Sequence, residues 1–101
     1  MSDPEATIYK QILLFVLDCL NRVYPSPLQV RTLYRVVIGL FNNYSKSLMN
    51  KDIAFLKQKG YIEYVDSKID SDPEFMDKCV GLTAKGKEIA MRIQTDPALE
   101  I

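Results

Sequence analysis

The sequence predicts a single α+β domain that is mainly helical, with three core helices, a two-stranded β-hairpin and a C-terminal helix. The chain has 101 residues, of which 48% are apolar and 26% charged, a composition typical of one globular domain with one core. Apolar residues recur at helical spacing before Gly60 and alternate directly after it. A helical period returns after Thr83, so the order is three helices, a hairpin and a helix.

The first helix is expected over residues 5–23, with Asp3 able to cap it and Pro4 suited to its first turn. Its apolar residues form two lines, Ile8, Ile12, Phe15, Cys19 and Val23, and Tyr9, Leu13, Leu17, Leu20 and Tyr24. Together the two lines make a stripe wider than a surface helix needs. We therefore expect the second line to face either a later helix or a second subunit.

The second helix is expected over residues 26–41, because two prolines at 25 and 27 end the first one. The third is expected over residues 46–59, with Ser45 or Ser47 as its N-cap and Gly60 as its left-handed terminator. Spacing predicts that four side chains of this helix face the core: Leu48, Met49, Ile53 and Leu56.

The hairpin is expected over residues 61–82, as two short strands joined by a polar loop over residues 66–77 that contains Pro73. Thr83 then caps a final helix over residues 84–95. This helix should carry Ile89, Ala90 and Ile93 on one side. The whole chain, residues 1–101, is thus predicted to be one domain.

Two motifs resemble those of the winged helix-turn-helix family, in particular its MarR-like and PadR-like small DNA-binding regulators. They are Ile53-x-x-Leu56-x-x-x-Gly60-Tyr61-Ile62 and Leu82-Thr83-x-x-Gly86. The resemblance implies that the hairpin is a wing and that residues 46–59 form a recognition helix. It also implies a transcription regulator that reads duplex DNA as a homodimer.

The outer face of the recognition helix and two arginines of the preceding helix are the candidate DNA contacts. Asn and Gln side chains make paired hydrogen bonds to adenine, and Lys contacts guanine or phosphate. Arg31 and Arg35 are four residues apart and share a face that can cross the DNA backbone. In addition to Arg31 and Arg35, the resemblance implies contacts from the third helix: Lys46, Ser47, Asn50, Lys51, Ala54, Lys57 and Gln58.

The charge distribution supports this interpretation in the middle of the chain and opposes it in the loop. Residues 25–64 carry six Lys and Arg against two acids, a net +4, whereas residues 65–78 carry two Lys against five acids, a net −3. Wings that enter a DNA groove usually offer Lys or Arg. The DNA phosphates would instead repel this acidic loop. The alternative is a winged-helix module for protein–protein contact in a larger assembly, which would use the acidic wing and exposed aromatics such as Phe55 or Phe75.

Catalysis, metal binding and cofactors are not expected. The chain contains no histidine and no phosphate-binding glycine loop. The run Asp70-x-Asp72-x-Glu74 begins like a calcium loop, but Phe75 and Gly81 stand where that loop needs Gly and Glu. Cys19 and Cys79 are expected to be reduced thiols.

The remaining expectations concern location and assembly. The acidic N-terminus does not have the pattern of a signal peptide, and the longest apolar run, Ile12 to Leu17, is too short for a membrane span. We therefore expect a cytoplasmic protein. The surplus apolar line of the first helix favours a homodimer through that helix.

Overall fold

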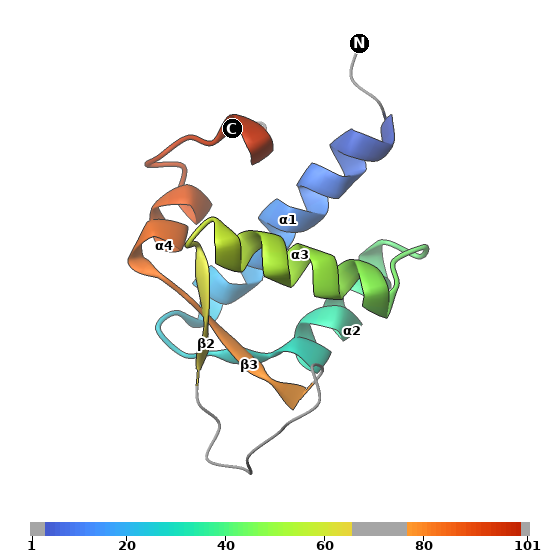
Figure 1. The fold of residues 1–101 in the computed structure, drawn as a ribbon, viewed down its shortest axis with the longest axis horizontal. Coiled ribbons are helices and arrows are strands. Elements are labelled where there is room, and N and C mark those ends of the chain that lie inside the picture. Colours follow the sequence, from blue (N-terminus) through green and yellow to red (C-terminus); the bar gives the residue numbers. More distant parts are fainter. Residues whose placement is uncertain (1–3, 66–76, 100–101) are drawn as a thin grey trace.

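The chain forms an α+β structure that is mainly helical (Figure 1). The computed structural model describes residues 4–65 and 77–99. Over these residues the elements are, in order, α1 (Pro4–Val23), β1 (Leu28–Gln29), α2 (Val30–Leu40), α3 (Lys46–Gln58), β2 (Ile62–Val65), β3 (Cys79–Leu82), α4 (Ala84–Ala90) and the 3₁₀ turn η2 (Pro97–Leu99). The predicted acidic loop and Phe75 lie outside the described residues, apart from Asp77.

The strands form a three-stranded antiparallel sheet in the order β1-β3-β2, and not the isolated two-stranded hairpin that the sequence predicts. The hairpin strands are present, with Ile62 opposite Leu82 and Tyr64 opposite Val80. The added strand is β1, whose Leu28 pairs with Val80 on the other edge of β3.

This added strand corrects the predicted start of the second helix, which is Val30 and not residue 26. Ser26 precedes Pro27, and a residue before proline is pushed towards extended backbone. Leu28 and Gln29 then pair with β3 as extended backbone, with Gln29 at φ −66°, ψ 142°. The Val30 N–H donates to the Lys78 carbonyl at 2.9 Å. The partner strand lies about fifty residues away, so local spacing does not reveal it.

The second apolar line of α1 is buried inside the same chain. Leu13, Leu17 and Leu20 are fully buried, and so is Val16 between the two lines. Figure 1 shows α4 and the C-terminal turn beside α1, and their Ile89 and Leu99 belong to the same buried cluster. The side chains of Ile8 and Tyr9, which begin the two lines, are outside the described part.

This burial removes the argument for a dimer through the first helix, because a later helix covers the surplus line. Of the two expected partners for this line, a later helix or a second subunit, the structure shows the later helix. A homodimer as such stays a prediction, but an interface would need residues other than Leu13, Leu17 and Leu20.

Local signals place α3 correctly at both ends. The Ser45 hydroxyl, and not that of Ser47, caps the helix by accepting from the Leu48 N–H at 3.2 Å. Gly60 adopts φ 81°, the left-handed conformation predicted for the terminator. Met49, Ile53 and Leu56 are buried as predicted. Leu48 is 36% exposed, which corrects its assignment to the inner face.

The last helix is shorter than predicted, because α4 ends at Ala90 and not near residue 95. Arg92 adopts φ 61°, which stops the helical path, and its guanidinium donates to the carbonyls of Ile89 and Ala90 at 3.2 and 2.8 Å. Ile93 therefore lies outside the helix and is 63% exposed, in contrast to its predicted place on one helix side with the buried Ile89 and Ala90.

The two motifs that carry the family resemblance meet in space. The Thr83 hydroxyl caps α4 by accepting from the Gly86 N–H at 3.0 Å, and it donates to the Gly60 carbonyl at 2.6 Å. The Thr83 N–H donates to the Tyr61 carbonyl at 3.0 Å. These bonds join the end of α3 to the start of α4.

A buried aspartate, Asp96, links the C-terminal segment to the residues that follow α3. The Tyr61 hydroxyl donates to Asp96, and the Lys59 ammonium forms an ion pair with that carboxylate at 3.1 Å. Burial, and then the hydrogen bond to Asp96 and its charge, raise the pKa of Tyr61 from 10 to about 12. The segment after α4 is thereby held against the folded domain, with Leu99 in the core.

We expect Tyr61→Phe to change how stability depends on pH at the alkaline end. Because the folded pKa lies above the unfolded one, the protonated tyrosine stabilises the fold fully below pH 10, and this contribution is lost as pH rises towards 12. At about 1.4 kcal/mol per pKa unit, the parent should lose about 3 kcal/mol across that window relative to the variant. Urea unfolding of both proteins at several pH values measures this difference. Parallel stability curves would contradict the assignment.

Candidate nucleic-acid interface

The predicted contacts on α3 lie together on one outer face. Positions separated by three, four and seven residues share a helix face. Each of the following residues is exposed: Ser47, Asn50, Lys51, Ala54, Lys57 and Gln58. Lys46 is exposed as well, and it is the first residue of the helix, as the predicted bounds place it. We call this set of seven residues the outer face of α3.

The only acidic residue of α3, Asp52, points into the protein and is fully buried. The Tyr44 hydroxyl, which is also buried, donates to its carboxylate. The outer face of α3 therefore carries three lysines and no carboxylate. The sequence reasoning missed this arrangement, although spacing was the available signal: Asp52 lies three residues after Met49 and four before Leu56, both inward positions.

The two arginines of α2 differ in their surroundings. The Arg31 guanidinium forms a hydrogen-bonded ion pair with the Asp77 carboxylate at 3.0 Å, which links α2 to the chain just before β3. Arg35 is exposed. A partly exposed ion pair contributes little to stability, but it partly neutralises Arg31. Of the two predicted backbone contacts, Arg35 therefore offers the less compensated charge.

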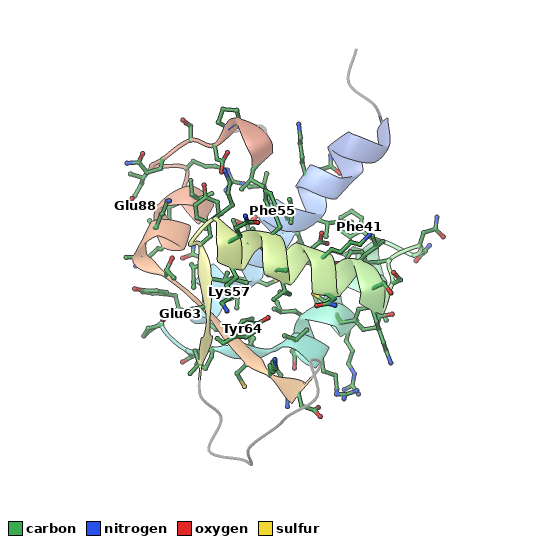
Figure 2. All side chains as sticks on the ribbon, viewed as in Figure 1. Phe41, Phe55, Lys57, Glu63, Tyr64 and Glu88 are labelled. Carbon is green, nitrogen blue, oxygen red and sulfur yellow. The ribbon has the colours of Figure 1, made fainter. Side chains whose placement is uncertain are left out.

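Tyr64 and Lys78 adjoin this face, and the sequence reasoning did not select them. The Lys57 ammonium lies 4.6 Å from the centroid of the Tyr64 ring, and the Lys78 ammonium lies 5.2 Å from it. Figure 2 shows Lys57 and Tyr64 next to one another between α3 and the sheet. Strand alternation was the available signal, since Tyr64 is two residues after the inward Ile62.

The apolar side chains near α3 divide into buried and exposed ones. Phe55 is partly buried against the core, on the edge of α3 away from Lys57 in Figure 2, which corrects its expected role as an exposed aromatic. On α2, Val36 is 43% and Leu40 63% exposed. Val36 and Leu40 are thus more exposed than Phe55.

Three further findings concern metal binding, membrane insertion and the cysteines. Across residues 4–65 and 77–99, no three acidic or cysteine side chains gather closely enough to hold a metal ion. No helix in the part of the chain that the structure describes combines the length and apolar character needed to cross a bilayer. Burial raises the pKa of the Cys19 thiol, which is half-buried in α1.

Comparison of the chain with protein-family models, with curated proteins and with solved structures found no match.

Proposed function

We propose that this chain is a winged helix-turn-helix transcription regulator that binds duplex DNA through the outer face of α3. The observation that carries the proposal is the charge of that face: it presents three lysines, while the only carboxylate of the helix, Asp52, is buried. Affinity for DNA comes largely from phosphate neutralisation, so a helix face without carboxylates is suited to it. The order of helices and strands fits the same proposal.

The side chains on this face also offer the chemistry that base recognition needs. An α-helix fits the major groove, where Asn and Gln pair with adenine and Lys contacts guanine. Asn50 and Gln58 are exposed at positions eight residues apart, and Lys51 lies beside Asn50. Arg35 on α2 would contact the phosphate backbone. In this arrangement two copies would read two half-sites, and sedimentation equilibrium would measure that assembly.

The proposal predicts that Asn50→Ala together with Lys51→Ala weakens duplex binding without destabilising the fold. Both side chains are exposed, and alanine favours helix, so the thermal unfolding temperature should be unchanged or slightly higher. Loss of one lysine and one amide contact should lower affinity at least about tenfold. Fluorescence anisotropy with a labelled duplex measures the affinity.

Lys87→Ala together with Gln94→Ala is the matched control, because it removes one lysine and one amide elsewhere. The control should bind like the parent. If the Asn50 and Lys51 double variant binds as tightly as the control, the outer face of α3 is not the DNA surface.

The second candidate is a winged-helix module for protein–protein contact that does not bind DNA. The observation that favours it is the exposure of Val36 and Leu40 on α2, because exposed neighbouring apolar side chains mark interaction surfaces. The two candidates differ in their response to salt. A protein-contact module should show no binding to random-sequence duplex even at low salt.

A further inference from the structure

The ammonium groups of two lysines from distant parts of the chain lie over the ring of Tyr64. Lys57 reaches its ring from the last turn of α3, at 4.6 Å from the centroid. Lys78 reaches it from the residue before β3, at 5.2 Å. The ring is 37% exposed, so the cluster of Lys57, Tyr64 and Lys78 is open to solvent.

The backbone fixes this arrangement. Tyr64 is opposite Val80 in the sheet, and Lys78 lies two residues before Val80. Since side chains alternate along a strand, Lys78 is placed on the same side of the sheet as Tyr64. The Lys78 carbonyl accepts from the Val30 N–H at 2.9 Å, which anchors its backbone to the start of α2. Both lysines are therefore held at the junction of α3 and the sheet.

The electrostatics of the cluster favour an anion. Two ammonium groups over one ring repel each other, and an exposed cation–π contact contributes only about 0.5–1 kcal/mol. Within the described residues no carboxylate forms an ion pair with Lys57 or Lys78, and nearby Asp77 is paired with Arg31. A phosphate bound at the cluster would offset the charge of both ammonium groups, and the Tyr64 hydroxyl can donate to an anion as well.

We infer that the cluster of Lys57, Tyr64 and Lys78 binds a phosphate of the DNA backbone, as a sequence-independent contact beside the outer face of α3. The inference rests on the proposed function and deepens it. It extends the DNA-contacting surface from α3 to the sheet. Phosphate contacts position a protein on the duplex, whereas base contacts give specificity.

The test is the salt dependence of duplex binding by Lys78→Gln, a residue outside α3. Removing one phosphate contact should reduce the slope of log affinity against log salt concentration by about one. Affinity at about 0.1 M salt should fall roughly fivefold to tenfold. The loss should be equal on two duplexes of unrelated sequence. Lys87→Gln is the matched control, since its ammonium lies 4.5 Å from the Tyr24 ring on another part of the molecule.

Tyr64 provides a second pair of variants. Tyr64→Phe keeps the ring beneath both ammonium groups and should retain the parent slope, whereas Tyr64→Leu should lower affinity severalfold because neither lysine is then held. An unchanged slope for Lys78→Gln, an equal loss in Lys87→Gln, or a loss on one duplex only would overturn the inference and leave the proposed function standing. Absence of duplex binding by the parent protein would contradict the proposed function, and this inference with it.

Discussion

Gly86→Ala is expected to be the most damaging small substitution in the protein. A Cβ at this position would lie 2.0 Å from the Tyr61 carbonyl oxygen and 2.8 Å from its carbon. Those atoms cannot move easily, because the same oxygen accepts from the Thr83 N–H and the Thr83 hydroxyl holds the Gly60 carbonyl. We expect a loss of at least about 3 kcal/mol in the free energy of unfolding.

Gly39→Ala is the matched control for this prediction. Nothing lies within 4 Å of a Cβ at Gly39, which is an exposed position near the end of α2. Alanine favours helix over glycine, so this substitution should stabilise the protein by up to about 1 kcal/mol. Urea unfolding of the two variants measures both values. If the two substitutions changed stability to the same small extent, α4 would not approach Tyr61 as closely as described.

Leu17→Glu is expected to abolish folding. Leu17 is fully buried in the core of a single chain, and an unpaired carboxylate there would lose its hydration. The milder Leu17→Ala should lose about 2–5 kcal/mol, the range for a buried leucine truncated to alanine. Circular dichroism and urea unfolding measure both effects.

Gln11→Glu introduces the same charge on the exposed side of α1 and should leave folding intact. An interface on this helix would behave differently from a core: Leu17→Glu would then keep the fold and change only the oligomeric state. A folded Leu17→Glu protein in sedimentation equilibrium would therefore show that Leu17 is covered by a second chain.

Features that depend on neighbours in the sequence were predictable. The inward positions Met49, Ile53 and Leu56 follow from helical spacing, and the left-handed Gly60 follows from the end of that spacing. Thr83 as N-cap follows from its place before a helical period. Each of these predictions depends only on residues within one or two helical turns of one another in the sequence.

Features that depend on distant segments were not predictable in the same way. Strand β1 exists because β3 offers Leu28 an edge to pair with, and the second line of α1 is buried because α4 and η2 return to it. At the candidate site, helical spacing identified the exposed residues of α3. It did not identify Lys78 and Tyr64, which the hairpin brings to Lys57.

Binding of the unmodified protein to a random-sequence duplex, measured as a function of salt concentration, tests the central claim most directly. Each phosphate neutralised contributes about −0.9 to the slope of log affinity against log salt concentration. The proposed contacts from Arg35, from the three lysines of the outer face of α3 and from Lys78 would together give a slope of about −3 to −5. Absence of binding at low salt, or binding that does not change with salt, would contradict the claim that this face binds DNA.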